Sequence, residues 1–175
     1  MITEDYVSFE TAKLLKEKGF DANCPYVWVY EGNSNPITKM PMAIFVEGET
    51  FADRKTVDAA AKLYMNIYEL DNKVEGYLCP TINLAMKWLR KEYNILIVVD
   101  YEWECDTTPY YFKIYRLDEN GKPKQVPVKG VSYDKDDNPT EHIIGYRDCE
   151  RSHKDFSSYE EACEAAIKYC LENLI

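Results

Sequence analysis

The stretch Ile95-Leu-Ile-Val-Val-Asp-Tyr-Glu-Trp-Glu104 decides the fold of this chain. Its first five residues are apolar without interruption, which is typical of a strand buried on both faces, so we expect it at the centre of a sheet. Its second half alternates, with Tyr101 and Trp103 on one face and acidic residues on the other. A helix with one apolar stripe is predicted from Pro80 to Asn94, directly before this strand.

The chain after this strand predicts hairpins and a final helix. The expected elements are, in order, a partner strand at 110–117, a hairpin turn at Asn120-Gly121, a short strand at 124–129, a polar loop at 133–141, a short strand at 142–146 and a helix that begins at Ser157 or Ser158. Small residues dominate the apolar stripe of that helix, so we expect it close against the sheet. The stripe is predicted to comprise Tyr159, Cys163, Ala166, Cys170 and Leu174.

The chain before this strand predicts one further helix and paired strands. The expected elements are a helix capped by Ser8 and stopped by Gly19, strands at 26–30 and about 40–46, a helix at 57–68 and a polar connection at 71–76. Hairpins join most of the strands, which favours an α+β fold with an antiparallel sheet and helices packed mainly on one face. We predict a single domain over residues 1–175, with an insertion at about 47–75.

Composition excludes several classes of function. The 175 residues hold 31 acids and 21 Lys or Arg, a formal charge of −10, which argues against a general nucleic-acid binder. An apolar content of 46% excludes a disordered chain. The first residues are acidic and no apolar window is long enough to span a bilayer, so we expect no membrane contact and a cytoplasmic location. There, the six cysteines are predicted to be thiols rather than disulfides.

The first candidate site is a row of carboxylates on the main strand. This acid row comprises Asp100, Glu102 and Glu104. Alternate residues of a strand stand about 6.6 to 6.8 Å apart, so the row by itself cannot share one small cation. One interpretation is a solvated face in which Lys113 and Arg116 of the return strand pair with the acids. The other is a surface for a basic protein.

Tyrosines lie beside the acid row and complete the predicted binding surface. The chain holds 15 tyrosines, and the candidates on this hairpin are Tyr101, Tyr111 and Tyr115. Tyrosine is favoured in binding patches because it offers a large contact area at low entropic cost. It is equally favoured in half-buried strands, so both interpretations stay open.

No stretch of the sequence completes a chemical motif. Residues 134–138 resemble the start of a calcium loop, but Pro139 stands in place of the required glycine and Gly145 in place of the required glutamate. Cys149, His153 and Asp155 are close in sequence, yet spacing within a loop does not establish a catalytic geometry. We therefore expect no cofactor, no metal site and no catalytic residue.

Three blocks of the chain resemble a known family. They are residues 7–20, 79–90 and 158–175, in the same order and reaching nearly both ends. The blocks are similar to those of a family of small acidic proteins encoded by gut anaerobic bacteria and their phages, to which no function is assigned. The resemblance implies a single domain and a mobile-element context, and it supplies no catalytic residue and no cofactor. Members of the family are shorter between the first strand and the helix at 80–94, which implies an expansion in this chain.

These observations predict a cytosolic, non-enzymatic interaction module that binds a basic protein through its acidic, tyrosine-rich surface. Residues 131–175 carry 11 acids and 5 bases, so more than half of the net charge lies in the last quarter of the chain. A phage or mobile-element accessory protein that occupies a host factor is one version. The alternatives are a small enzyme or ligand binder with a pocket between helix and sheet, and a self-associating structural protein that forms a homodimer through a strand edge near Met40 or Gln125.

Overall fold

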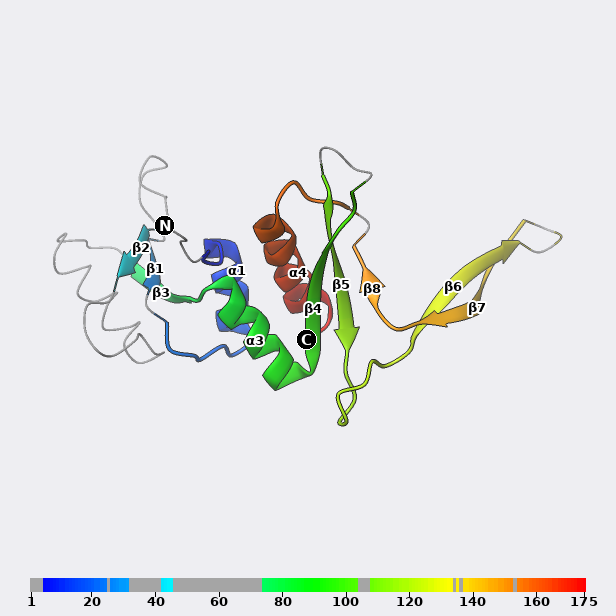
Figure 1. Cartoon of the computed structure of the whole chain (residues 1–175), viewed down its shortest axis with the longest axis horizontal. Coiled ribbons are helices and arrows are strands. Elements are labelled where there is room, and N and C mark those ends of the chain that lie inside the picture. The colour runs from blue at the N-terminus through cyan, green and yellow to red at the C-terminus, as the bar shows by residue number, and fades with distance from the viewer. Residues whose placement is uncertain are drawn as a thin grey trace. The chain divides into compact units, whose positions relative to one another are not determined.

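The chain has an α+β fold made of helices and antiparallel sheets, shown in the computed structural model of Figure 1. The structure describes residues 5–24, 26–31, 42–45, 74–103, 108–133, 135, 137–152 and 154–175. These residues belong to two compact units: Met1–Trp88 with Ile167–Ile175, and Leu89–Ala166. Among the described residues, no helix is both long enough and apolar enough to cross a membrane.

The sheet of the first unit has the strand order β2-β1-β3. β1 (Tyr26–Glu31) pairs antiparallel with β2 (Met42–Phe45) on one side, as predicted, and with β3 (Val74–Cys79) on the other. β3 corrects our prediction of a polar connection, since the strand begins at Val74. Its pairing with β1 satisfies the backbone of Glu75 and Gly76, two residue types that rarely favour strands. The other residues of the predicted insertion, and the helix predicted at 57–68, lie outside the described residues.

α1 (Phe9–Glu17) begins and ends where the sequence predicts. The Ser8 hydroxyl accepts a hydrogen bond from the Thr11 amide, at 3.3 Å. At the other end Gly19 has a φ of +84°, and the Phe20 amide donates to the Leu15 carbonyl at 2.9 Å. This is a Schellman motif, which satisfies carbonyls that the helix leaves without partners. It also turns Phe20 into the core, where the side chain is buried.

α3 (Ile82–Tyr93) lies within the predicted range from Pro80 to Asn94 and has a capping residue at each end. The Thr81 hydroxyl accepts from the Leu84 amide at 3.2 Å, and Asn94 adopts a left-handed conformation with φ of +56°. β4 then begins at Ile95 without an intervening loop. A left-handed residue at this position reverses the chain sharply enough for the strand to follow the helix at once.

The main sheet of the second unit has the order β4-β5-β8. β4 (Ile95–Tyr101) pairs antiparallel with β5 (Tyr110–Arg116), and β5 also pairs with β8 (Glu150–Arg151). The expectation that β4 lies at the centre is therefore wrong for the described sheet, because β5 holds that place. Only alternate residues of β4 are buried, and Val98 is 36% exposed. An uninterrupted apolar run does not require burial on both faces.

α4 (Tyr159–Asn173) begins after the Ser158 cap, and in the second unit its first half lies beside β4 and β5 (Figure 1). The Glu161 amide donates to the Ser158 hydroxyl at 3.1 Å, and the Glu161 carboxylate accepts from the Ser157 amide at 3.1 Å. The predicted apolar stripe is buried at Cys163, Ala166 and Cys170, but Tyr159 is an exposed residue. Small side chains allow the helix close to the sheet, as the sequence indicates.

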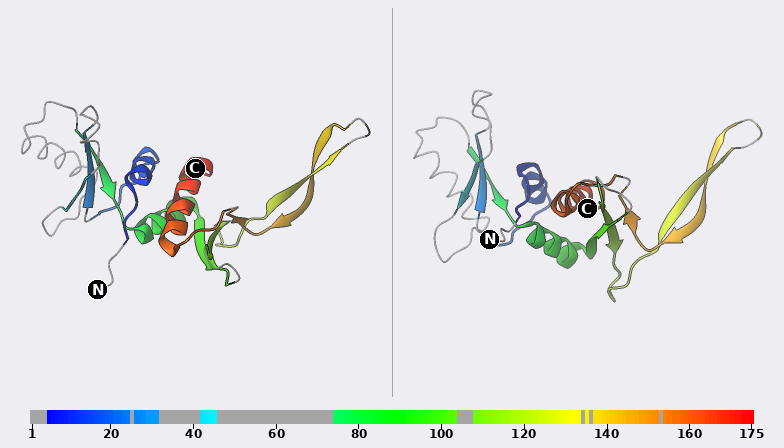
Figure 2. Two further views of the ribbon diagram at one scale, coloured as in Figure 1. Left: turned by 90° about the horizontal axis from the view of Figure 1, so that it is seen from above. Right: turned by 45° about the horizontal axis from the view of Figure 1, so that its top comes forward.

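Two further strands form a separate two-stranded sheet, which we call the ribbon. β6 (Val126–Tyr133) pairs antiparallel with β7 (Pro139–Arg147), and both views of Figure 2 show the strands side by side and twisted. The predicted strands at 124–129 and 142–146 are thus too short. The polar loop predicted at 133–141 is wrong at its ends, since Tyr133 and 139–141 belong to the strands. Cross-strand pairing extends both strands beyond the limits that local sequence indicates.

Candidate functional site

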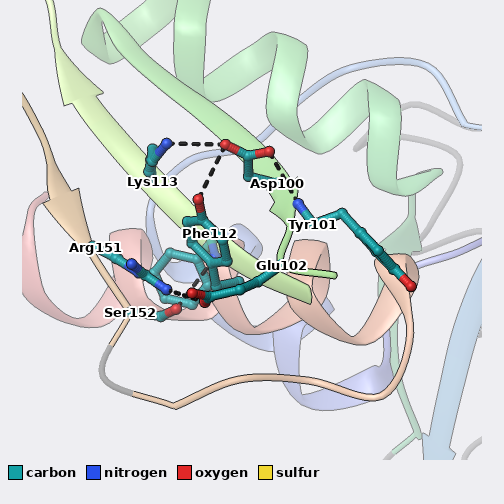
Figure 3. Close-up of polar contacts among 8 residues, drawn as sticks. Asp100, Tyr101, Glu102, Phe112, Lys113, Arg151 and Ser152 are labelled. Carbon is teal, nitrogen blue, oxygen red and sulfur yellow. Dashed lines mark hydrogen bonds and ion pairs between the residues drawn. The ribbon is translucent and has the colours of Figure 1, made fainter. Parts of the chain in front are cut away.

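Asp100 of the acid row is held by two side chains of the neighbouring strand (Figure 3). Its Oδ2 accepts hydrogen bonds from Lys113 Nζ at 2.9 Å and from Tyr111 Oη at 3.2 Å. Its Oδ1 accepts from the Tyr101 amide at 3.0 Å. Tyr111 stands directly opposite Asp100 in the β4–β5 register, so these side chains share one face of the sheet. The hydrogen bond from Lys113, followed by that from Tyr101 and the charge of Lys113, lowers the pKa of Asp100.

Glu102 is paired with a cation from the third strand of the same sheet. The Arg151 guanidinium of β8 lies 2.7 Å from the Glu102 carboxylate. The same guanidinium stacks 3.8 Å from the centroid of the Tyr111 ring, an arrangement that favours the cation electrostatically. Ser152 extends the contact, since its hydroxyl accepts from the Phe112 amide at 3.2 Å. These interactions join all three strands across one face.

The acid row is therefore partly neutralised within the chain. The predicted pair between Asp100 and Lys113 is confirmed. The prediction for Arg116 is wrong, because its guanidinium pairs with Glu150 at 2.9 Å instead. Glu104 lies outside the described residues. A basic partner of this surface would thus have to compete with Lys113 and Arg151, and its binding stays a prediction.

The predicted tyrosines do not form one surface. Tyr111 and Tyr115 alternate along β5 and so lie on the face of Asp100. Tyr101 points to the opposite face, where its ring meets Tyr110 edge-on, with centroids 5.2 Å apart. Tyr110 in turn lies 6.4 Å from Tyr159 at the start of α4. The three candidate tyrosines are divided between the two faces of the sheet.

Cys149 contacts Tyr115, and its neighbour in the sequence, His153, lies outside the described residues. Burial, the charge of Cys149 and a hydrogen bond with it together raise the pKa of Tyr115. The expectation that Cys149, His153 and Asp155 form no catalytic site therefore stays a prediction. Asp134 and Asp136 of the calcium-like loop also lie outside them. Within the residues that the structure does describe, no three metal-binding side chains gather.

Several exposed apolar side chains of the second unit lie on the ribbon, and the sequence analysis does not include them in the candidate site. Five bulky side chains are more than half exposed there: Val131 (54%), Tyr133 (68%), Ile143 (56%), Ile144 (63%) and Tyr146 (63%). The available signal was the alternation of Val131 and Tyr133 with polar residues, which is typical of a strand. The prediction places Tyr133 in a polar loop at 133–141 instead.

Most of these side chains share one face of the ribbon. In the β6–β7 register Pro127 stands opposite Tyr146, Lys129 opposite Ile143, Val131 opposite Glu141, and Tyr133 opposite Pro139. Residues directly opposite each other, and every second residue along a strand, lie on the same side. We call this set the ribbon face. Lys129 and Glu141 form an ion pair at its middle, with an Nζ to Oε2 distance of 2.8 Å.

Ile144 lies on the other side of the ribbon, at a β-bulge. The register shifts between Val128 and Lys129, which leaves Ile144 as an extra residue between their partners Gly145 and Ile143. A Cβ placed on Gly130 would come within 2.6 Å of Ile144 Cγ2. Glycine at 130 therefore provides the space that Ile144 occupies. Its contact with Gly130 separates Ile144 from the ribbon face.

The Asp100 contacts predict a specific titration behaviour. We expect the carboxyl pKa of Asp100, measured by NMR, to lie below the ordinary aspartate value of about 3.9. Replacing Lys113 by methionine removes the strongest hydrogen bond and should raise that pKa. Since the folded pKa is lowered, the stabilisation exists above the ordinary pKa and is lost as pH falls through the folded one. Lys129→Met is the control, and an equal shift at Asp100 in both variants would contradict the assignment.

Comparison with known proteins gives no identification for this arrangement. No protein-family model, no curated protein and no solved structure matches the chain.

Proposed function

We propose that this chain is a non-enzymatic protein-interaction module and that the ribbon face is its contact surface. One observation carries the proposal: Val131, Tyr133, Ile143 and Tyr146 are each more than half exposed on one face of a two-stranded sheet. Exposed apolar side chains that gather on one face, here around the Lys129–Glu141 ion pair, are typical of protein interaction sites, whereas single exposed apolar residues are not. Tyrosine is also among the residue types that contribute most to binding energy.

The energetics support a partner on this face. Full burial of a valine or isoleucine side chain contributes about 1.5 to 3 kcal/mol of free energy. Val131 and Ile143 are more than half exposed, so the ribbon alone gains only part of this contribution. A two-stranded sheet is marginally stable in water on its own. A protein that covers the ribbon face would therefore gain apolar burial and stabilise the ribbon in the same step.

The location and biological setting are part of this proposal. Five cysteines of the described chain are thiols, a state that a reducing cytoplasm maintains. The three blocks that resemble proteins of gut anaerobes and their phages support an accessory role in a mobile element. The acid row supports a second contact less well, because Lys113 and Arg151 already pair with two of its carboxylates.

Affinity capture with two matched variants tests the contact surface. The tagged protein is mixed with a lysate of its source cells, and this lysate also contains the same protein without the tag. The captured proteins are identified by mass spectrometry. We expect Val131→Thr/Ile143→Thr to reduce the captured partner at least about tenfold, because threonine preserves strand propensity but removes apolar contact. Asp100→Asn/Glu102→Gln should leave capture within about twofold of the wild type.

The control variant separates the two candidate surfaces. Both variants must retain the wild-type circular dichroism spectrum, so that a loss reports on contact and not on unfolding. Loss of capture only in the Asp100→Asn/Glu102→Gln variant would move the contact to the acid row and reject the ribbon face. Failure of the wild type to capture any protein, its own copy included, would reject the interaction module.

A further inference from the structure

The ribbon face has a pattern that repeats after a half turn about its centre. The rows along the face are Pro127 with Tyr146, Lys129 with Ile143, Val131 with Glu141, and Tyr133 with Pro139. Rotation by 180° about an axis perpendicular to the face exchanges each residue with a counterpart of similar or complementary chemistry. The exchanged pairs are Pro127 with Pro139, Tyr146 with Tyr133, Val131 with Ile143, and Lys129 with Glu141. The apolar residues thus lie on one diagonal of the two middle rows, and the charges lie on the other.

This pattern allows the face to bind a second copy of itself. Consider a two-fold axis that lies between the two faces, along the diagonal from Val131 to Ile143. Each of these two side chains then meets its own counterpart. Lys129 and Glu141, which pair with each other within the chain at 2.8 Å, lie over the partner's Glu141 and Lys129, so that the two ion pairs form one network of four charges. A two-fold contact of this type is self-complementary, so every interaction occurs twice. Apolar groups meet apolar groups, and opposite charges meet.

The geometry of a strand pair sets the crossing angle of such a contact. Neighbouring rows on one face are about 6.8 Å apart, and paired residues about 5 Å apart. Reflection across the Val131–Ile143 diagonal then places the two ribbons at roughly 70° to each other. Near-perpendicular packing of two sheets is one of the two arrangements that proteins use.

The edges of the ribbon disfavour the competing arrangement, in which a second chain adds a strand. β6 contains Pro127, which has no amide hydrogen to donate. β7 contains the bulge at Ile144, and bulges interrupt the regular edge that an added strand requires. Natural sheets use both devices to prevent edge pairing. These features favour contact through a face of the ribbon over contact through one of its edges.

Charge favours approach at the ribbon over approach elsewhere. Residues 126–147 contain three Lys or Arg and four Asp or Glu, a balance of −1, whereas the rest of the chain carries the other −9 of the net −10. Two copies of so acidic a chain repel each other, and the ribbon contributes little to that repulsion because its own net charge is small. A basic partner, by contrast, would be attracted to the acidic remainder and not to the ribbon.

We propose that a second copy of this chain covers the ribbon face, in a crossed two-fold dimer with Val131 and Ile143 on the axis and Lys129 beside the partner's Glu141. This inference rests on the proposed function and names its partner. The face measures about 26 Å by 10 Å, which is far less than the roughly 800 Å² that each partner contributes to a standard interface. The dimer is accordingly weak and depends on protein concentration.

Analytical ultracentrifugation from about 10 µM to 1 mM, with charge-reversal variants, tests the pairing. We expect dimer formation in the wild type, and a dissociation constant at least about fivefold weaker in Lys129→Glu and in Glu141→Lys. The double variant Lys129→Glu/Glu141→Lys should return to within about threefold of the wild type. Higher salt should strengthen the dimer, because it screens the repulsion between two acidic chains. NMR spectra of the dilute monomer show whether each ribbon remains folded.

Disulfide trapping tests the position of the axis independently. In a Cys105→Ser/Cys149→Ser background, Val131→Cys should form an intermolecular disulfide under mild oxidation, because each Val131 faces its own counterpart. Thr140→Cys is the matched control, since Thr140 stands opposite Ser132 on the other side of the ribbon. Equal trapping at both positions would overturn the crossed geometry.

The outcomes separate this inference from the function it rests on. A wild-type protein that stays monomeric to 1 mM overturns the second copy as the partner. If that monomer still captures a different protein, and Val131→Thr/Ile143→Thr abolishes the capture, the interaction module stands with another occupant. A complex that weakens with added salt would identify that occupant as a basic protein. If neither a dimer nor a captured protein is found, both proposals fail.

Discussion

Replacement of Ile114 by alanine is expected to lower the free energy of unfolding by about 2 to 5 kcal/mol. Ile114 is completely buried in β5, the central strand of the main sheet, and stands opposite the buried Ile97. Alanine removes three carbon atoms and leaves a cavity that a strand paired on both sides cannot close. Urea unfolding followed by circular dichroism measures the change.

The matched control for this substitution is Ile143→Ala. Ile143 has the same side chain and also lies in a strand, but it is 56% exposed on the ribbon. Measured at low protein concentration, where the chain is monomeric, the substitution should change stability by no more than about 0.5 kcal/mol. Equal losses in the two variants would show that β5 does not form the core of its unit.

Cys24 should react with iodoacetamide at pH 8 about a thousandfold more slowly in the native protein than after unfolding. Burial, together with the charge of Cys79, raises the pKa of the Cys24 thiol from 9.0 to about 12. A rise of three pKa units lowers the thiolate fraction about a thousandfold, and the thiolate is the reactive form. Its Sγ also donates to the Ala22 carbonyl at 3.2 Å. Timed alkylation followed by peptide mass spectrometry measures the rate at each cysteine.

Cys149 provides the internal comparison for that experiment. It is partly exposed, whereas Cys24, Cys79, Cys163 and Cys170 are buried. We expect Cys149 to be alkylated before any of these four in the native protein. Cys163 should be slow for the same reason as Cys24, because burial raises its pKa to about 11. Alkylation of Cys24 at the rate of Cys149 would show that the first unit opens readily in solution.

The helix boundaries could be predicted because the signals that define them are local. Ser8 and Gly19 act on the backbone within four or five residues, and Thr81 and Asn94 do the same for α3. Capping depends on neighbours in sequence, so it can be recognised without knowing the rest of the fold. The same reason explains why the α4 cap at Ser158 was identified.

Strand positions were harder to predict because pairing is not local. β4 has the composition of a central strand, yet it lies at the edge of its described sheet because β8 supplies the second neighbour of β5. β3 contains Glu75 and Gly76, and its pairing with β1 overrides their weak propensity. The ribbon was underestimated for a related reason, since its strands stabilise each other.

The candidate site shows the same division between local and distant contacts. The pairing of Asp100 with Lys113 follows from a hairpin register that the sequence suggests, because the two residues are diagonal neighbours. The pairing of Glu102 with Arg151 joins residues 49 positions apart. No pattern within the hairpin indicates that second contact. The sequence therefore predicts only one of the two ion pairs that neutralise the acid row.

The topology of the first unit limits how far the chain could be shortened. β2 and β3 both run antiparallel to β1, so they are parallel to each other. Phe45 ends β2 opposite Tyr26, whereas Val74 begins β3 opposite Glu31, at the far end of β1. A tight turn cannot connect parallel neighbours of one strand. A deletion between Phe45 and Val74 must therefore retain at least about six residues to cover the roughly 20 Å back along β1.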